Sequence, residues 1–333
     1  MLGGLLSLLS AITFAYANAS VRRGVLSGTV LQAVGVSLPI ALPIFALVMW
    51  PIGGFAALAA FDARSLDLLI VAGVIHFAWG RYCNYKATKA IGANLVAPVQ
   101  QYSLILTLAL AVLWLGEPLT VLRIVGIALV VAGPSLTLKP EPKASAEVTP
   151  ETPGETAFTP QYAEGYLYAL LSAIGFGLSP ILVGMAFAHK GIAVGVAGGF
   201  VSYLAATVAI GLTLVLPGRW SDFRAMDRVS ARWFVLSGIL VALSQMTRYM
   251  ALAVAPVSVV SPIQRLSLVF RIYFGWIINP KHEVFGGRIV AGTVVSLLGA
   301  VALSVSVGDV QQVLPLPDAL AAVLNWHWSI GAR

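Results

Sequence analysis

The sequence contains little charge. Only 10% of its 333 residues are Asp, Glu, Lys or Arg, whereas 59% are hydrophobic and the mean hydropathy is +0.91. A soluble domain carries about 25% charged residues, because a polar surface must cover its core. This chain cannot build such a surface. The composition therefore predicts an integral membrane protein.

Cysteine and catalytic signatures are also scarce. Cys83 is the single cysteine of the chain, which excludes a disulfide scaffold, an iron–sulfur cluster and a Cys-rich zinc site. The sequence has no H-E-x-x-H, no G-x-S-x-G and no paired aspartates, and its acids are too few to hold a metal. We therefore predict that the chain is not an enzyme and binds neither a metal nor a cofactor.

The positive charge does not indicate nucleic-acid binding. The chain has 20 Lys and Arg against 13 Asp and Glu, giving a formal net charge of +7. Half of the basic residues stand singly between long apolar runs, where signals of membrane topology belong. We predict no nucleic-acid partner.

Long hydrophobic runs dominate the sequence. A membrane-spanning helix needs about 20 mostly apolar residues, and the runs are continuous rather than alternating, which favours helices over a barrel. We predict an all-α membrane protein with ten spanning helices. They cover residues 2–21, 28–50, 66–85, 93–115, 120–138, 163–187, 193–216, 231–253, 256–278 and 286–307.

A polar segment divides these runs into five and five. Residues 140–161 are rich in Pro, Glu and Thr, and we predict a flexible hydrophilic linker there. The linker separates a five-helix unit over residues 1–139 from a second over residues 162–308. Residues 309–333 end in an amphipathic stretch with two tryptophans, and we expect this tail to lie at the membrane interface.

Short sequence matches recur in the same order in both halves. The pairs are 8–14 (LLSAITF) with 170–176 (LLSAIGF), 98–104 (PVQQYSL) with 262–268 (PIQRLSL), and 123–125 with 288–290 (both RIV). Their offsets of 162, 164 and 165 residues indicate an internal repeat. Because each unit has an odd number of predicted spans, the second starts on the opposite side of the membrane. The sequence therefore predicts inverted repeats, the design in which a carrier exposes one central site alternately to either side.

A family resemblance is carried by the first half. Residues 92–98 read GANLVAP, residues 115–120 read LGEPLT after a hydrophobic span, and Gly126 and Gly133 follow. This order resembles the EamA-type module of the drug/metabolite transporter superfamily. The resemblance implies a ten-helix carrier with a central cavity, built from two EamA modules. Members move amino acids, metabolites, nucleotide sugars and drugs, so it does not name a substrate.

The second half is a weaker copy of this pattern. Residues 255–262 read APVSVVSP, and residues 279–283 read NPKHE where the first half has Leu-Gly-Glu. The two closing loops therefore need not work alike.

Positive charge inside the predicted spans is the main clue to a site. Four arginines lie within spans, at positions 81, 248, 265 and 271, whereas no Asp or Glu lies well inside one. A charged side chain at mid-bilayer costs roughly 2.5 kcal/mol or more, so each arginine needs a cavity, a partner or a function.

Helical spacing groups these arginines with other polar residues. Residues three or four apart share a helix face, and the repeat aligns the polar stripes of spans 3 and 8 and of spans 4 and 9. We predict a cavity lined by Arg81, Asn84, Tyr85, Gln100, Gln101, Gln245, Arg248, Tyr249, Gln264, Arg265 and Arg271. Guanidinium and amide donors in this cavity would suit a carboxylate, a phosphate or another anionic group.

Structural roles remain open for several of these residues. Arg248 is near enough to a helix end to extend its charge to the interface. The glutamines could instead form hydrogen bonds between helices. Tyr85 and Tyr249 could equally belong to an aromatic belt at the membrane surface.

A histidine and two prolines have two interpretations each. His76, near the centre of span 3, either moves protons or hydrogen-bonds a neighbouring helix. Pro98 and Pro262 open spans 4 and 9, and either mark a gate or occupy the first turn of an ordinary helix. Span 1 offers Tyr16 and Asn18 but no acid, which argues against the exchange of cations for protons that small multidrug carriers of the superfamily perform through a carboxylate in that span.

These observations favour transport. We predict a secondary carrier, an exporter or exchanger, of a small anionic or zwitterionic metabolite such as an amino acid, in a bacterial inner membrane. Its expected partners are a small-molecule substrate and the lipid bilayer, and a homodimer stays open. One alternative is a translocator of lipid head groups or lipid-linked metabolites, and another is an intramembrane enzyme.

The distribution of basic residues conflicts with the family resemblance. The loops after odd-numbered spans lie on one side of the membrane and contain twelve basic residues, whereas the other side has four. The positive-inside rule then places both termini outside the cytoplasm, whereas the resemblance implies that both are cytoplasmic. Either the loop charges have another role, or the orientation differs, or a span is miscounted.

Overall fold

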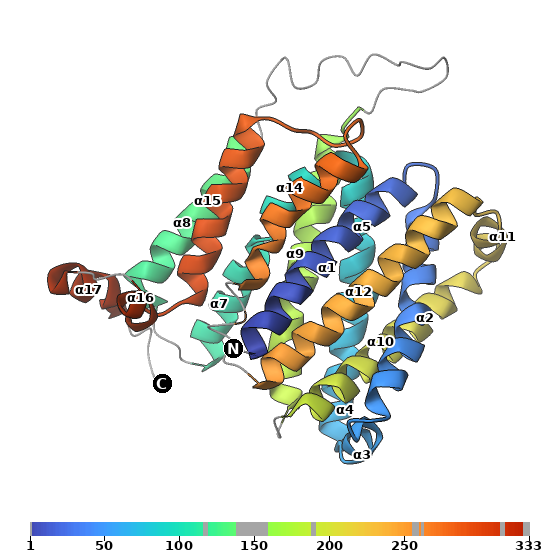
Figure 1. The fold of residues 1–333 in the computed structure, drawn as a ribbon, viewed down its shortest axis with the longest axis horizontal. Helices are drawn as coiled ribbons and strands as arrows, with labels where there is room; N and C mark the ends of the chain where they lie inside the picture. The colour runs from blue at the N-terminus through green and yellow to red at the C-terminus, as the bar shows by residue number, and fades with distance from the viewer. Residues whose placement is uncertain are drawn as a thin grey trace.

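Helices account for most of the fold. The structure is a computed structural model that describes residues 2–115, 119–137, 159–187, 191–254, 260, 263–313 and 317–328. Six helical runs in these ranges are long and apolar enough to cross a membrane, so the chain is an all-α membrane protein (Figure 1). They are α1 (Leu2–Gly24), α2 (Val30–Met49), the continuous run of α4 (Ala63–Gly73), η1 (Val74–Gly80) and α5 (Arg81–Ile91), α9 (Tyr162–Ala186), α10 (Ile192–Leu214) and α12 (Arg228–Val254).

The other four predicted spans contain shorter helices. The fourth is divided into α6 (Ala93–Val99) and α7 (Tyr102–Leu115), and the ninth contains α14 (Ser267–Ile278). The fifth and tenth contain α8 (Val121–Thr137) and α15 (Gly287–Ser304). A count of ten spans therefore stays a prediction.

Short elements connect and extend the bundle. They are α3 (Gly54–Ala59), α11 (Arg219–Arg224), α16 (Val307–Val313), α17 (Asp318–Asn325) and the two-residue strands β1 (Leu119–Thr120) and β2 (His327–Trp328). The strands pair antiparallel, so the C-terminal region is tied to the start of α8. In α17 the apolar side chains of Leu320 and Val323 are exposed, as is Trp326 directly after it, and the location of this tail at a membrane interface stays a prediction.

Helix α1 shows why the bundle suits a lipid environment. Its buried positions are mostly small or weakly polar, among them Ser7, Ser10 and Ala15, whereas Leu5 and Leu9 are exposed. In water this distribution would be unfavourable, but lipid tails are as apolar as leucine, and small residues let helices approach closely. Ser10 and Ser244 hydrogen-bond where α1 crosses α12.

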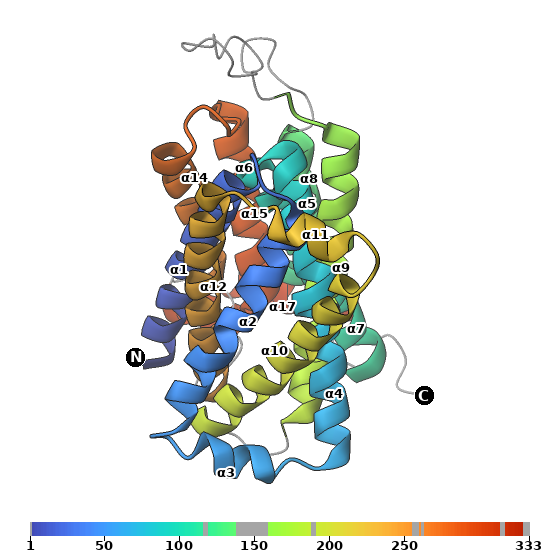
Figure 2. The same ribbon diagram turned by 90° about the vertical axis from the view of Figure 1, so that its right-hand side faces the viewer.

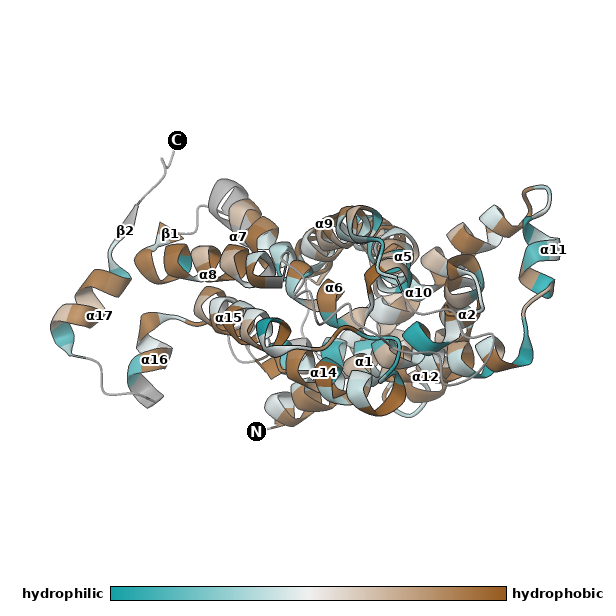
Figure 3. Cartoon of the chain, turned by 90° about the horizontal axis from the view of Figure 1, so that it is seen from above, coloured by the Kyte–Doolittle hydropathy of each residue, from teal (hydrophilic) through white to brown (hydrophobic). Residues whose placement is uncertain are grey.

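The pair α8 and α15 lies at one edge of the molecule, with α16 and α17 beyond it (Figures 1 and 3). A Cβ atom at Gly126 would lie 3.0 Å from the carbonyl oxygen of Gly299, and one at Gly299 would lie 2.8 Å from that of Gly126. Glycine is therefore required where these two backbones touch. The predicted repeat places α8 and α15 at equivalent positions.

Packing between the two halves follows a regular pattern. Helix α1 packs on α12 and α14, and α9 packs on the α4–α5 run and α7; α2 packs on α12, and α10 packs on α4. The predicted repeat pairs each helix of the first unit with one of the second, such as α1 with α9 and α2 with α10. When every helix is replaced by its counterpart, these contacts are found again. The contacts α2–α10 and α8–α15 each join a helix to its own counterpart. Helix α9 also runs in the opposite direction to α1 (Figures 1 and 2).

Candidate functional site

The break between α6 and α7 lies inside the bundle. Gln100 and Gln101 form a turn between the two helices, and both side chains are buried. Pro98 is the sixth residue of α6, so the prediction that it occupies the first turn of a helix is wrong. The helix already begins at Ala93, and Pro98 lacks the N–H group that would donate to the carbonyl of Asn94, which favours the break that follows at Gln100 and Gln101. Pro262 lies outside the described residues.

A chain of hydrogen bonds starts at this break. Arg271 Nη1 donates to Gln100 Oε1 at 2.8 Å, Gln100 Nε2 donates to Asn84 Oδ1 at 2.7 Å, and Asn84 Nδ2 donates to Asn18 Oδ1 at 3.2 Å. We call these four residues the central network. They come from α14, the α6–α7 break, α5 and α1, so the network joins both halves of the chain.

A small cavity lies next to the central network. Its volume is about 10 Å³, which is about the space of one water molecule. It is lined by Phe14, Ala17, Asn18, His76, Arg81, Asn84, Tyr85, Phe176, Val241 and Gln245. The structure therefore brings five predicted residues together around this central cavity, in a state too closed for a metabolite.

Arg81 is held among aromatic rings. Its Nη2 donates to the hydroxyl of Tyr203 at 2.7 Å, and its guanidinium lies 5.0 Å from the ring centre of Phe77 and 5.1 Å from that of Tyr203. Cation–π contacts of this kind stabilise a desolvated guanidinium. Its Nη1 is buried with no hydrogen-bond partner in the described part of the chain, which leaves one donor unused.

Three further arginines gather beside the cavity. Arg265 lies within electrostatic range of Arg248 and Arg271, and all three keep a buried Nε that has no partner within the described ranges. Arg248 Nη1 is 3.5 Å from Gln245 Oε1, and its charge reaches His76, so Arg248 turns into the bundle rather than toward the membrane surface. Neither ion pair of the described residues includes any of these three arginines or Arg81.

The remaining predicted residues have more local roles. Tyr85 and Tyr249 are buried in the main apolar core, which contradicts a place in an interface belt. Gln101 Nε2 bonds to the carbonyl of Ala97 one turn earlier. The amide nitrogen of Gln264 is buried and has no partner among the residues described.

His76 lies in the π-helical turn η1. Its ring packs at 4.6 Å from the rings of both Phe77 and Phe176. The described residues include no hydrogen-bond partner for its Nδ1, so the interhelical bond that was the alternative interpretation is not present at this nitrogen. π-helical turns inside α-helices frequently occur at functional sites.

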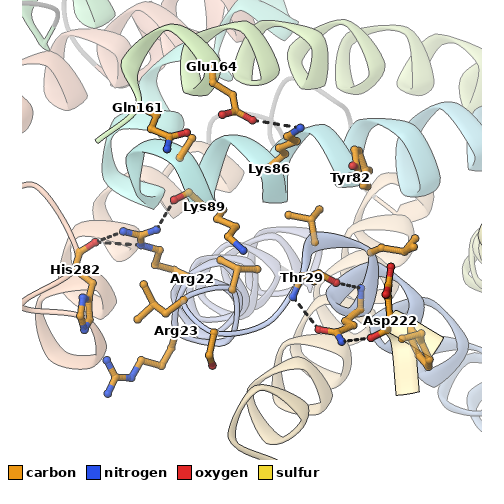
Figure 4. Close-up of a pocket in the computed structure, with 18 of the residues that line it drawn as sticks. Arg22, Arg23, Thr29, Tyr82, Lys86, Lys89, Gln161, Glu164, Asp222 and His282 are labelled. Carbon is orange, nitrogen blue, oxygen red and sulfur yellow. Dashed lines mark hydrogen bonds and ion pairs between the residues drawn. The ribbon is translucent and has the colours of Figure 1, made fainter. Parts of the chain in front are cut away.

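A much larger cavity opens at the end of the bundle where α1 ends and α2 begins. It has a volume of about 960 Å³, and we call it the vestibule (Figure 4). Arg22, Arg23, Lys86, Lys89 and Arg219 line it, against two acids. All five basic residues belong to the twelve loop cations that produced the charge asymmetry.

The two acids of the vestibule do not balance its charge. Glu164 Oε1 lies 3.2 Å from Lys86 Nζ, and Asp222 is exposed on α11. Lys86 also donates to the hydroxyl of Tyr168 at 3.1 Å. The vestibule therefore keeps an excess of positive charge, which raises the local concentration of anions.

Comparison with known proteins identifies the first half. The EamA-like transporter family matches residues 1–139. Residues 1–139 are therefore similar to an EamA-like transporter module. The matched segment contains α1 to α8.

Structural comparison finds proteins that share the fold. No curated protein matches the sequence, whereas 22 chains of solved structures match the fold. One of them is described only as "Crystal structure of protein" and has a TM-score of 0.59 at 16% sequence identity. The match covers 90% of this chain and 96% of that chain. At this identity the likeness shows the fold alone.

A buried ion pair joins residues 1–139 to the second half of the chain. Arg22 Nε, on α1, lies 3.8 Å from Glu283 Oε1, in the loop between α14 and α15, and both side chains are almost fully buried. Burial raises the pKa of Glu283, while Arg22 and the backbone N–H groups of Asn94 and Ala93 act in the opposite direction. Glu283 is the one buried acid in the described part of the chain.

Sequence reasoning missed several of these residues. Asn18 was noted only for the absence of an acid in its span, and Tyr203 carried no signal because tyrosine is common in membrane helices. Arg22 was counted as a loop charge, although it is completely buried. For Glu283 a signal existed, since the segment NPKHE departs from the EamA pattern at this position.

Proposed function

We propose that the protein is a secondary carrier of a small anionic or zwitterionic metabolite, such as an amino acid, that works by alternating access as an exporter or exchanger. The proposed architecture has two inverted five-helix units, residues 1–139 and 162–308, around the central cavity. The recurrence of helix contacts on exchange of the halves supports this division. Since the spans are helices, a bacterial inner membrane is the proposed location.

The observation that carries the proposal is the set of arginine donors around the central cavity. Arg81, Arg248, Arg265 and Arg271 each keep a buried nitrogen without a hydrogen-bond partner among the described residues. A buried donor left unpaired costs about 1–3 kcal/mol. An anionic group that enters this site would satisfy several of these donors at once, which supports an anion or the carboxylate of a zwitterion as the substrate.

The central network supports a role in coupling as well as binding. Arg271 belongs to the second half, and its partners Gln100, Asn84 and Asn18 belong to the first. A ligand that bonds to Arg271 would compete with Gln100 and so change the contact between the halves. This is the kind of differential contact that an alternating-access carrier requires.

The test starts from the purified protein. A thermal-shift screen with amino acids, organic acids, phosphorylated metabolites and quaternary ammonium cations identifies compounds that raise the melting temperature, because a ligand that binds the folded state stabilises it. Hits are then assayed as radiolabelled substrates in proteoliposomes, both by net uptake and by counterflow.

The proposal predicts saturable uptake of an anionic or zwitterionic hit. The Arg271→Ala variant should lose this uptake, whereas Arg64→Gln, a change at an exposed position at the start of α4, should retain it. Uptake of quaternary cations in exchange for protons would overturn the anion preference. Wild-type uptake in a correctly folded Arg271→Ala variant would overturn the site.

A further inference from the structure

Arg22 closes the floor of the vestibule. Its Nη1 donates to the carbonyl of Thr88 at 2.9 Å. The same Nη1 donates to the carbonyl of Lys89 at 2.8 Å, and Nη2 donates to that of His282 at 2.6 Å (Figure 4). The first two carbonyls belong to the last turn of α5, where the helix dipole is negative, and the Thr88 carbonyl also accepts the backbone N–H of Gly92 at 3.0 Å. Arg22 therefore holds the end of α5 to the α14–α15 loop.

Glu283 performs the opposite task at the next helix. Its Oε1 accepts the backbone N–H of Ala93 at 2.7 Å and its Oε2 accepts that of Asn94 at 3.1 Å. These are the first two residues of α6, where N–H groups are unpaired and the dipole is positive. The cation of this ion pair thus lies at the C-terminal end of α5, and its anion lies at the N-terminal end of α6.

The corner is built for close contact with the carboxylate. Gly92, between α5 and α6, has a φ of +82°, and a Cβ atom there would lie 2.5 Å from Glu283 Oε2. Two further bonds hold the same loop to the first half. Asn279 Nδ2 donates to the carbonyl of Ala19 at 2.8 Å, and Asn94 Nδ2 donates to that of Val284 at 3.2 Å.

This ion pair lies between the two cavities. Arg22 lines the vestibule, whereas Asn18, one turn earlier in α1, lines the central cavity. Helix α6 begins at the bonds to Glu283 and ends at Gln100 in the central network. A movement of α6 away from Glu283 would therefore change the contacts at the vestibule floor and also those of the central network.

We propose that Arg22 and Glu283 form the latch of a gate between the vestibule and the central cavity, and that α6 is the element released when the latch opens. Glu283 is then a positioning residue for transport. The proposal deepens the proposed function, because a carrier must close its site toward one side, but its test needs no substrate.

The experiment measures whether a thiol in the central cavity reacts from the vestibule side. Ala17 lines that cavity and is buried, so the parent for the test carries Ala17→Cys in a Cys83→Ala background. Proteoliposomes receive a membrane-impermeant maleimide outside only. The labelling rate is divided by that of a Ser221→Cys reference on exposed α11, which corrects for vesicle orientation.

The latch predicts slow labelling at position 17 in the parent. Adding Glu283→Gln removes the charge of the latch, and labelling should become about tenfold faster, which corresponds to about 1.4 kcal/mol. Glu283→Asp retains the carboxylate and should restore most of the slow labelling. Arg22→Ala removes the hydrogen bonds to three carbonyls at once and endangers folding, so the test uses Glu283.

A second thiol position separates an open gate from a loosened fold. Ala206 on α10 is fully buried in the main apolar core, away from both cavities. An Ala206→Cys thiol should label equally slowly with Glu283 and with Glu283→Gln, because the latch controls only the path to the central cavity. Faster labelling at both positions would show that Glu283 merely stabilises the bundle, which would overturn the latch.

A matched control separates the latch from helix capping in general. Asp227 accepts the backbone N–H groups of Val229 and Ser230 at the start of α12, but it is exposed. Asp227→Asn should leave labelling at position 17 unchanged. Equal labelling of the parent and Glu283→Gln would overturn the latch, whereas failed anion uptake with latch-dependent labelling would overturn only the proposed substrate class.

Discussion

The central cavity and the vestibule both have positively charged side chains nearby, but they differ in volume, in enclosure and in the pairing of those charges with carboxylates. The central cavity holds about 10 Å³ and the vestibule about 960 Å³. The arginines at the centre are enclosed by helices of both halves and lack carboxylate partners in the described ranges, whereas Lys86 of the vestibule is paired with Glu164. The centre is therefore closed and restrictive, and the vestibule is wide.

This difference separates two uses of positive charge. Coulomb interactions at the surface are weakened by water and by salt, so vestibule cations attract anions without distinguishing among them. A buried donor without a partner gains much more from the right ligand, because no water competes for it. Selectivity should therefore depend on the centre, and the rate of capture on the vestibule.

The largest effect is expected for Arg271→Ala. The change removes the charged donor to Gln100 Oε1, which lies 2.8 Å away, and leaves a buried amide oxygen unpaired. Loss of a charged hydrogen bond costs about 1.5–3 kcal/mol, so kcat/KM for the identified substrate should fall by about 10- to 100-fold in proteoliposomes. Arg271→Lys should retain part of the activity. An unchanged kcat/KM in the alanine variant would show that Arg271 does not determine substrate selectivity.

A smaller effect is expected where the two regions meet. Gly92→Ala places a side chain on a residue with φ +82° and against Glu283, at a cost of about 1–3 kcal/mol. The melting temperature in detergent should fall by a few degrees. Gly184→Ala is the matched control, because nothing lies within 4 Å of a Cβ atom there. Equal melting temperatures for the two variants would show that the corner tolerates a side chain.

The vestibule should respond more weakly. Arg219 is exposed on α11 and lines this cavity, and Arg219→Gln should raise KM about two- to threefold at low salt with kcat unchanged. The difference should vanish at about 0.5 M salt, where the Debye length is only a few ångströms. A KM increase that persists at high salt would mean that Arg219 contacts the substrate directly.

The smallest effect concerns an exposed cap. Hydrogen bonds from Ser230 hold the pKa of Asp227 below its ordinary value. A lowered pKa stabilises the fold above the ordinary value, and this stabilisation is lost as pH falls through the lowered one. The melting temperature of Asp227→Ala should therefore lie slightly below that of the parent near pH 7, and the two should converge below about pH 3. If the difference in melting temperature did not change with pH, the effect of Asp227 would come from packing rather than from its charge.

The sequence by itself determined the class of protein and the residue types of the site. A chain with 10% charge and 59% hydrophobic residues can only fold in lipid, and the family pattern at residues 92–98 and 115–120 lies within the matched module. Embedded arginines were visible because each interrupts a long apolar run. Helical periodicity then placed Arg81, Asn84 and Tyr85 on one face, and all three line the central cavity.

Only the tertiary structure decided which polar groups meet. The pairing of Arg271 with Gln100 joins residues 171 positions apart, and no spacing rule predicts it. Arg22 and Glu283 looked like loop charges, since sequence patterns do not show that a loop folds into the bundle. Their burial follows from the corner between α5 and α6, where the negative end of one helix dipole favours a cation and the positive end of the next favours an anion.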